Sequence, residues 1–116
     1  MRIVEPQTQQ EFESYYHLRW LCLRKPWGKP VGTEKDELED SSIHAMLIDD
    51  DNIPVAVGRL HLNKPDEAQM RYMAVAEQER GKKYGDRILR YLEPVSYTHL
   101  RAHETKANLV CRLLLE

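Results

Sequence analysis

Apolar residues alternate with polar ones, or form short apolar runs, in four segments of the chain, a pattern typical of β-strands. We expect these strands at residues 2–5, 42–48, 53–62 and 68–75. Polar turns at residues 49–52 and 63–66 join the last three strands, so these should pair as an antiparallel sheet. Gly58 lies in the middle of the third segment, where a glycine often marks a bulge or the close approach of another backbone.

Bulky residues at helical spacing follow the first strand. Phe12, Tyr16 and Leu23 share one face of a predicted helix. Thr8 and Glu11 have the spacing of a capping box, which predicts that this helix starts at Thr8. A loop rich in proline and glycine ends it.

Two more helices complete the predicted order of elements. A charged segment at residues 34–40 predicts a short exposed helix. Ile88 and Leu92 mark the apolar face of another helix at residues 84–92, which Pro94 ends. The order is therefore strand, helix, helix, three strands, helix. It builds an α+β domain, also classed as mixed α/β, in which helices cover a mostly antiparallel sheet.

The composition restricts the class of protein. A length of 116 residues is enough for one domain, and 41% hydrophobic with 31% charged residues is typical of a soluble globular fold. The net charge of −2 argues against nucleic acid or an anionic membrane as the main partner. Cys22 and Cys111 lack metal-ligand spacing, and neither a signal peptide nor an apolar span of roughly 20 residues is found, so we expect a cytoplasmic protein.

The main candidate for chemistry is the loop between the fourth strand and the last helix. It carries three cations, Arg80, Lys82 and Lys83, and two glycines, Gly81 and Gly85. Glycines let a backbone turn tightly against a ligand, and the N–H groups of a first helical turn attract anions. The loop therefore predicts a phosphate-binding site. The alternative is a solvated basic loop that only begins a helix.

Residues 80–85, Arg-Gly-Lys-Lys-Tyr-Gly, resemble the Arg/Gln-x-x-Gly-x-Gly/Ala motif of the GCN5-related N-acetyltransferase (GNAT) superfamily. Arg80 and Gly85 match the ends of the motif, and Lys83 stands at its first glycine. The resemblance runs from about residue 3 to residue 93. Over this range the chain is similar to one bacterial subfamily, in which some members carry a thioesterase-like domain. The segments that carry it are residues 16–20, 23–27, 34–39, 56–61 and 71–75.

The resemblance implies a cosubstrate and a reaction. Acetyl-CoA would give its acetyl group directly to an amine of a small molecule or a peptide, and the parent protein could be a homodimer. The backbone of Met73, Ala74 and Val75 would bind the pantetheine arm, and one N–H group there would stabilise the tetrahedral oxyanion. The pyrophosphate would be held by Arg80, Gly81, Lys82, Lys83, Tyr84 and Gly85.

Direct transfer needs a base that deprotonates the amine, and His61 and Glu79 are the candidates. His61 shares a strand face with Arg59, so this face could line the acceptor site. It could equally be an ordinary exposed or helix-covered face, with a water chain as the base. We expect no metal site: His99 and His103 have i, i+4 spacing, but the glutamate of the zinc-protease motif is missing between them.

The resemblance stops after Pro94. A complete GNAT domain continues into a fifth strand, a fourth helix and further strands, and we find none of these in residues 95–116. That segment resembles translated sequencing-adapter read-through. We therefore predict a truncated acetyltransferase domain at residues 1–94 and a tail without evolved function. The apolar residues within 109–115 could still form a helix that docks on the core.

A missing fifth strand has a physical consequence. One edge of the fourth strand would be bare, and the ligand slot would have a single wall. We therefore expect little or no acetyltransferase activity from this chain, whereas the parent protein would be an N-acetyltransferase. The alternative is a CoA-binding or regulatory half-domain without catalysis. A nucleic-acid-binding domain is disfavoured by the net charge and the few aromatic residues.

Overall fold

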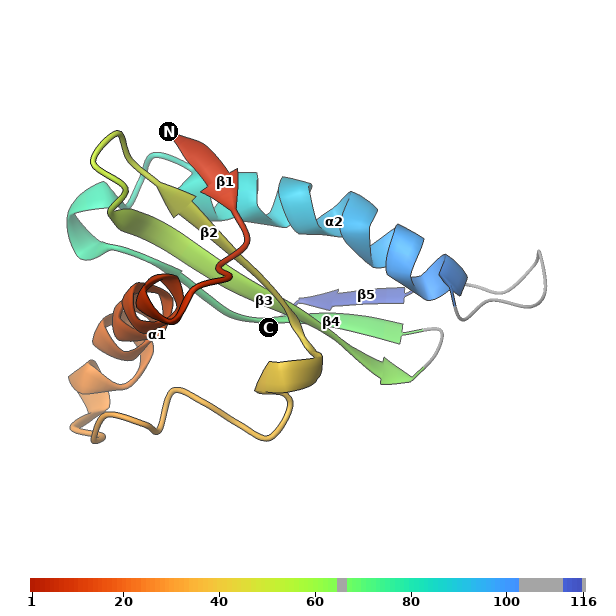
Figure 1. Ribbon diagram of the computed structural model, residues 1–116, viewed down its shortest axis with the longest axis horizontal. Helices are drawn as coiled ribbons and strands as arrows, with labels where there is room; N and C mark the ends of the chain where they lie inside the picture. The colour runs from red at the N-terminus through yellow and green to blue at the C-terminus, as the bar shows by residue number, and fades with distance from the viewer. Residues whose placement is uncertain (65–66, 103–111, 116) are drawn as a thin grey trace.

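The structure, a computed structural model, describes residues 1–64, 67–102 and 112–115 (Figure 1). Five strands form one sheet in the order β1-β2-β3-β4-β5. Neighbours among the first four are antiparallel, and β5 runs parallel to β4. Their bounds are Arg2–Val4 (β1), Ile43–Ile48 (β2), Pro54–Lys64 (β3), Glu67–Val75 (β4) and Arg112–Leu115 (β5). The first four confirm the strands that the hydrophobic pattern predicts.

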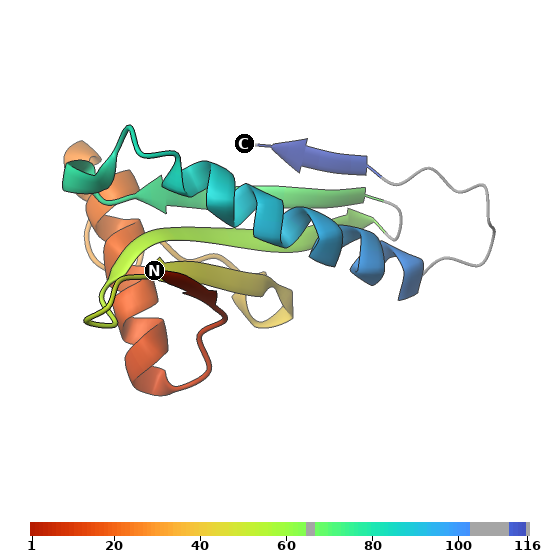
Figure 2. The same cartoon turned by 90° about the horizontal axis from the view of Figure 1, so that it is seen from above.

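Two α-helices lie on opposite faces of the sheet. In Figure 1, α1 (Gln9–Leu23) lies below the sheet and α2 (Tyr84–Ala102) lies above it. Figure 2 shows that α2 runs along the strands, whereas α1 crosses them. Short 3₁₀ turns in the connections are η1 (Lys25–Trp27), η2 (Glu39–Ser41) and η3 (Glu77–Glu79). The molecule is therefore a three-layer arrangement of helix, sheet and helix.

The capping box predicted at the start of α1 is confirmed. The Thr8 side chain accepts a hydrogen bond from the Glu11 N–H group at 3.1 Å, and the Glu11 carboxylate accepts one from the Thr8 N–H group at 3.0 Å. Two N–H groups that lack helical partners are thereby satisfied.

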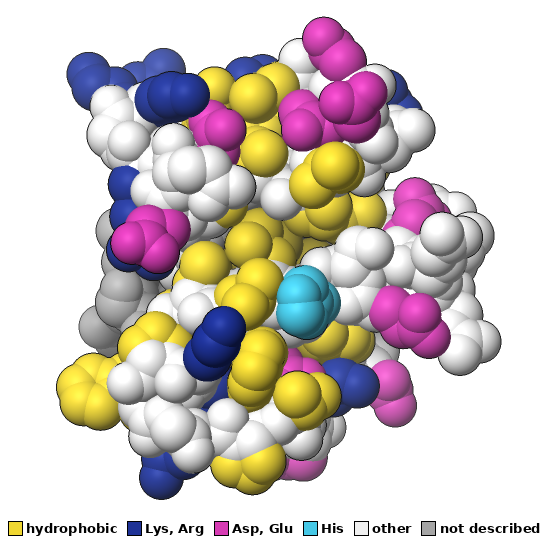
Figure 3. Space-filling view, turned by 90° about the vertical axis from the view of Figure 1, so that its left-hand side faces the viewer, with side chains coloured by type: hydrophobic (Ala, Val, Ile, Leu, Met, Phe, Trp, Pro, Cys, Tyr) yellow, Lys and Arg dark blue, Asp and Glu magenta, His cyan; other side chains and the backbone are white. Residues whose placement is uncertain are grey.

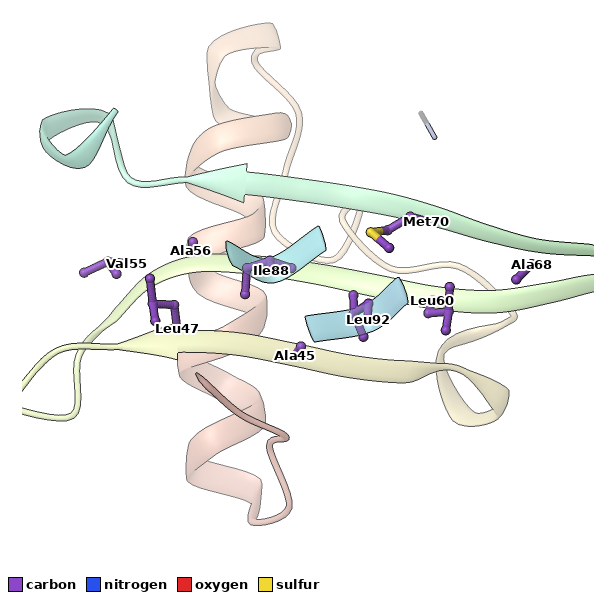
Figure 4. Close-up of a cluster of buried hydrophobic side chains, with 9 residues drawn as sticks. All are labelled: Ala45, Leu47, Val55, Ala56, Leu60, Ala68, Met70, Ile88 and Leu92. Atoms are coloured by element: carbon purple, nitrogen blue, oxygen red, sulfur yellow. The ribbon is translucent and has the colours of Figure 1, made fainter. Parts of the chain in front are cut away.

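Apolar side chains fill both helix–sheet interfaces. On the α2 side the buried cluster comprises Ala45, Leu47, Val55, Ala56, Leu60, Ala68, Met70, Ile88 and Leu92 (Figure 4). On the α1 side it comprises Tyr15, Leu18, Met46, Ile48, Val57, Ala74 and Ala76. Successive residues of β2 belong to alternate clusters, as the pleat of a strand requires.

Gly58 lies where α2 comes very close to the sheet. A Cβ atom built on Gly58 would lie only 2.6 Å from Cγ2 of Ile88. The mid-strand glycine therefore does mark a close approach, made by a side chain of α2 and not by another backbone, and the register also shifts at Gly58, as expected for a bulge. The missing side chain lets α2 pack tightly against β3.

A bulge interrupts β4. Between the pairs Arg59–Arg71 and Val57–Ala74, β4 has one residue more than β3. Tyr72 lies in the bulge and has a φ angle of 55°. Because side-chain direction alternates with a period of two, the extra residue exchanges the two faces of the strand. The buried even-numbered residues of β4 face α2 before the bulge and α1 after it.

The predicted helix at residues 34–40 is wrong. The segment consists of turns and one 3₁₀ turn, η2. Its carboxylates bind distant cations: Asp36 binds Arg59 at 2.6 Å, and Glu39 binds both Arg19 and Arg59 at 2.9 Å. These tertiary contacts override a local helical preference. Glu34, expected on an exposed helix, is buried.

The predicted end of the last helix at Pro94 is also wrong. The helix α2 continues to Ala102, and the proline lies inside it. Val95, one residue further on, still packs against the core on the α2 side. Packing on the sheet therefore outweighs the hydrogen bond that a proline cannot donate. The helix crosses the domain boundary expected at residue 94, and the assignment of a separate tail stays a prediction.

The expectation that the tail holds no fifth strand is wrong as well. Residues 112–115 form β5, which pairs with residues 67–70 of β4, and they do not form a helix. An open strand edge presents unpaired backbone groups to any extended segment, which accounts for an apolar tail that adds a strand. Leu109 and Val110, also part of the predicted helix, lie outside the described residues.

Candidate functional site

The outer side of β4 is only partly covered. β5 pairs with β4 from Glu67 to Met70, and no described strand lies beside residues 71–75 on that side. We call residues 71–75 the open edge. Backbone groups that point outward there are available to a ligand, unlike those inside the sheet.

The backbone of Val75 points to the open edge. The N–H group of Ala76 donates to the carbonyl of Val55 in β3 at 2.9 Å, and successive residues of a strand present their groups to opposite sides. The carbonyl of Val75 accordingly accepts hydrogen bonds from two side chains outside the sheet, Arg80 Nε at 3.2 Å and Cys22 Sγ at 3.4 Å.

Met73, Ala74 and Val75 are predicted to bind pantetheine, but because of this alternation their backbone groups do not all point to the same side of β4. Ala74 pairs with Val57 of β3, whereas Met73, two residues before Val75, presents its backbone to the open edge. Spaced N–H and C=O groups on a free edge let an extended, amide-containing ligand bind as an added strand would. Binding of acetyl-CoA by these residues stays a prediction.

The basic loop leads directly from this edge to the N-terminus of α2. Gly81 has a φ angle of 86°, and no atom lies within 4 Å of the place where its Cβ would be. A Cβ on Gly85 would lie 3.4 Å from Met73 Sδ and 3.6 Å from Val75 Cγ2. The first turn of α2 therefore packs on the end of β4, and the loop before it is open to solvent.

Lys83, which stands where the motif has its first glycine, has a φ angle of 63°, in the left-handed region that favours glycine. A residue with a Cβ in this region carries about 1–2 kcal/mol of strain.

The loop concentrates positive charge at a helix N-terminus. Arg80, Lys82 and Lys83 are all exposed, and α2 begins directly after them. Lys82 Nζ lies 2.9 Å from Glu79 Oε2, and this contact raises the pKa of the lysine above its ordinary value. The dipole and free N–H groups of the helix attract anions to the same point. The predicted pyrophosphate residues are therefore brought together in a geometry that suits a diphosphate.

His61, the first predicted base, is buried and neutral. Burial is the main cause that lowers its pKa, and the positive charge of Arg59 adds to it. Nδ1 of His61 lies 3.2 Å from Arg59 Nη2, which can only donate, and Nε2 lies 2.9 Å from Asn63 Oδ1. The neutral ring therefore carries its proton on Nε2 and accepts at Nδ1.

Glu79, the second predicted base, lies far from the first. It belongs to η3, beyond the end of β4, whereas His61 pairs with Gln69 near the beginning of β4. Gln69 and Val75 are six residues apart, which is about 20 Å along a strand. The structure therefore does not bring His61 and Glu79 to one reacting centre.

Sequence reasoning did not single out Tyr72, Asp36 or Glu39. These residues form a buried polar cluster with Arg19 and Arg59 on the α1 face of the sheet. The pKa of Asp36 is held well below its usual range, chiefly by the hydrogen bond from Arg59. Acidic residues in a charged segment carry no signal of such distant partners, so only the tertiary structure identifies them.

A cleft of about 840 Å³ lies between α1, the β2–β3 turn and η3. Figure 3 shows hydrophobic side chains lining a hollow on this face. Cys22 and Arg80 lie in its wall, and the same two side chains bind the carbonyl of Val75. The cleft therefore adjoins the open edge from the α1 side.

The described residues offer neither a metal site nor a membrane-spanning helix. Among them, no three His, Cys, Asp or Glu side chains gather so that they could hold a metal ion. The predicted pair of histidines stays untested, because His103 lies outside the described part of the chain. None of the helices that the structure describes is long and apolar enough to cross a membrane.

A family model described as "Acetyltransferase (GNAT) family" matches residues 12–112. The match extends beyond residue 93, where the resemblance read from the sequence ends. It also includes the basic loop and the open edge of β4.

Solved structures show the same fold. An aminoglycoside 6'-N-acetyltransferase complexed with coenzyme A matches with a TM-score of 0.69 at 15% identity, over 85% of this chain and 57% of that one. The ribosomal-protein-alanine N-acetyltransferase of Brucella melitensis matches with a TM-score of 0.70 at 13% identity, over 100% and 80%. The glucosamine-6-phosphate N-acetyltransferase of Arabidopsis thaliana matches with a TM-score of 0.63 at 13% identity, over 99% and 80%.

At these identities the likeness concerns the fold alone. The antiparallel sheet of β1–β4, with α1 and α2, is part of a GNAT-like fold. The chain spans 57% of the length of the aminoglycoside enzyme. The three relatives are named for different acceptors, so this fold does not determine which amine is acetylated.

Proposed function

Since the chain belongs to the acetyltransferase (GNAT) family, we propose that it serves the transfer of an acetyl group from acetyl-CoA to an amine. The observation that carries the proposal is the contact between the basic loop and the open edge of β4. Gly85, at the end of the loop, packs on Met73 and Val75. One extended ligand can therefore meet both the cations and the strand edge.

Each part of the site would contact a different part of acetyl-CoA, which when bound supplies the reactive thioester. Arg80, Lys82, Lys83 and the first N–H groups of α2 would neutralise the diphosphate. The backbone groups of Met73 and the N–H group of Val75 would pair with the amides of the pantetheine arm, since the Val75 carbonyl already accepts hydrogen bonds from Arg80 and Cys22. An N–H group on the same edge would stabilise the negative oxygen that forms when the amine attacks.

For the base we propose His61 in preference to Glu79. The lowered pKa of His61 leaves its ring neutral at pH 7, as a proton acceptor must be. Glu79 is paired with Lys82 beside the phosphate loop, where no proton is removed. We expect the acceptor to be an amine of a small molecule or a peptide, bound on the α1 face near His61.

One observation favours a second candidate, a module that binds CoA without catalysis. The Nδ1 atom of His61 already accepts a hydrogen bond from Arg59, and Glu79 is ion-paired. A base that is engaged in this way must release its partner before it takes a proton. Binding and turnover are therefore separate questions for this chain.

The proposal is tested by titrating the 116-residue chain with CoA in a calorimeter. We expect a dissociation constant in the micromolar range for the wild-type chain. Arg80→Ala should bind CoA about tenfold more weakly, because it loses a bidentate contact between the guanidinium group and a phosphate. Arg90→Ala is the matched control, since Arg90 is an exposed arginine of α2 whose ion pair with Asp86 is surface-exposed. We expect it to leave the affinity unchanged.

Turnover is measured separately, as release of the free thiol of CoA from acetyl-CoA in the presence of a panel of amines. Low turnover from this chain stays a prediction. Binding without any turnover supports the second candidate. Absence of CoA binding refutes both candidate functions. If Arg80→Ala and Arg90→Ala change the affinity equally, the basic loop does not bind the phosphates of CoA.

A further inference from the structure

Tyr72 adopts a backbone conformation that an aromatic residue does not favour. Its φ angle is 55°, and it lies in the bulge of β4 at the open edge. A residue with a Cβ stays in this region only where its surroundings hold it there. The Tyr72 side chain is buried, with 5% of its surface exposed. Its contacts must therefore fix the bulge.

Four guanidinium groups surround the ring of Tyr72. The Cζ atoms of Arg19, Arg59, Arg71 and Arg24 lie 4.5, 4.7, 4.8 and 5.5 Å from the ring centroid. Each distance is within the roughly 6 Å over which a cation is attracted to the face of an aromatic ring. The arginines come from α1, its C-terminal cap, β3 and β4, so the ring joins separate elements of the fold.

Two of these arginines are held in place by carboxylates. Arg19 and Arg59 are fully buried, and each binds Glu39 at 2.9 Å. Asp36 binds Arg59 and accepts a hydrogen bond from the Tyr72 hydroxyl at 3.2 Å. The Nε atoms of both arginines have no hydrogen-bond partner among the described residues. A buried cluster with such unmet groups is weak evidence for a role in stability alone.

The same cluster also holds the strand opposite the bulge. The hydroxyl of Tyr15 donates to the carbonyl of Gly58 at 3.1 Å and accepts a hydrogen bond from Arg19 Nη2 at 2.9 Å. Gly58 is the residue of β3 that faces the extra residue of β4. Both strands are therefore fixed to α1 at the bulge.

We propose that Tyr72 is a positioning residue for the cofactor edge. The arginines contact the ring of Tyr72 and fix its position. The fixed ring stabilises the bulge, and the bulge determines which backbone groups of β4 face outward. Met73 follows Tyr72 directly and is the second β4 residue of the bulge, so the bulge determines the direction of its N–H group. The inference rests on the proposed function, because it assigns the outward N–H and C=O groups to a bound acetyl-CoA.

The test uses the whole chain with its methionines labelled with ¹⁵N. Met46, Met70 and Met73 then report on β2, on β4 before the bulge and on the bulge itself. In Tyr72→Leu we expect the Met73 signal of the free protein to move and the Met46 signal to stay. We expect the dissociation constant for CoA to rise about tenfold. Tyr72→Phe, which keeps the ring, should retain the wild-type affinity within about threefold.

Leu47→Ala controls for a simple loss of stability. Leu47 is fully buried in β2 and faces α2, away from the cluster. This variant should lower the melting temperature and leave the affinity for CoA unchanged. If it weakens CoA binding as much as Tyr72→Leu does, the role of Tyr72 is merely structural and the inference fails. An unmoved Met73 signal in Tyr72→Leu also overturns it.

The test remains decisive in two other cases. If the wild-type chain does not bind CoA, the proposed function fails, and the Met73 signal still decides whether the ring holds the bulge. If Tyr72→Leu does not fold, Arg24→Met replaces it. That variant removes a half-buried guanidinium from the ring, together with its hydrogen bonds to the carbonyls of Leu23 and Thr33. It should shift the same Met73 signal by a smaller amount, and an unmoved signal counts against the inference.

Discussion

Replacing Gly58 with alanine puts a methyl group where α2 packs closely on the sheet. The new Cβ would lie 2.6 Å from Ile88 Cγ2 and 3.6 Å from Leu92 Cδ1. Carbon atoms prefer a separation of about 3.5–4.0 Å, so α2 must move by about 1 Å. Ile88 and Leu92 are both fully buried and have no free space to enter.

The expected loss follows from two opposing contributions. Overpacking costs about 1–3 kcal/mol, and replacing glycine within a strand returns about 0.5–1 kcal/mol. We therefore expect Gly58→Ala to lower the free energy of unfolding by up to about 2.5 kcal/mol, with a central value of about 1 kcal/mol, measured by urea denaturation.

A pair of Ile88 variants shows whether the Cγ2 methyl causes this loss. Ile88→Leu removes that methyl at nearly constant volume, and Ile88→Val keeps it. Gly58→Ala should be nearly neutral in the Ile88→Leu background and still costly in the Ile88→Val background. An equal loss in both backgrounds would refute the steric argument, because the coupling free energy between the two sites would then be zero.

Four other perturbations act on strain and charge. Lys83→Gly should raise the free energy of unfolding by up to about 1 kcal/mol in urea, because it relieves a φ angle of 63°; an unchanged midpoint counts against strain. Burial lowers the pKa of His44, so the unfolded chain takes up this proton first and stability should fall as the pH drops below about 6.5; in His44→Gln this phase should shrink to the part that His61 contributes, because burial lowers the pKa of His61 as well. Arg59 lowers the pKa of Asp36, so its contribution is complete above about pH 4 and should be lost in stronger acid, measured by melts from about pH 5 to 2. Glu39→Gln should cost about 3–5 kcal/mol, since it leaves two buried cations without their shared carboxylate; Glu37→Gln, an exposed change in the same segment, should cost almost nothing.

Local signals predicted much of the fold correctly. The capping box at Thr8 acts over three residues, and the four strands follow from a period of two along β1 to β4. The turn between β2 and β3 was equally local, since Asp49 accepts hydrogen bonds from the N–H groups of Asp51 and Ile53. Features of this kind depend only on neighbouring residues, so the sequence contains them completely.

The errors arose where distant residues decide the conformation. Asp36 and Glu39 were interpreted as part of a charged helix because their partner Arg59 lies 23 positions away from one and 20 from the other. The end of α2 was placed at Pro94 because the gain from packing Val95 on the sheet is invisible in the local pattern. Gly58 indicated a possible bulge, and the register does shift there. The role of Tyr72 on the partner strand was missed for the same reason as the other errors, since its contacts come from residues of other elements.

The core and the candidate site are coupled through α2. Ile88 fits against Gly58 one turn after Gly85 rests on Met73 and Val75, so the packing that stabilises the fold also places the N-terminus of α2 over the open edge. On the opposite face the arginine cluster fixes the bulge of the same strand. The open edge is therefore held from both sides by buried contacts, although no described strand pairs with it. Rigid support of this kind is what a strand edge needs in order to bind a flexible pantetheine arm without a large ordering cost of its own.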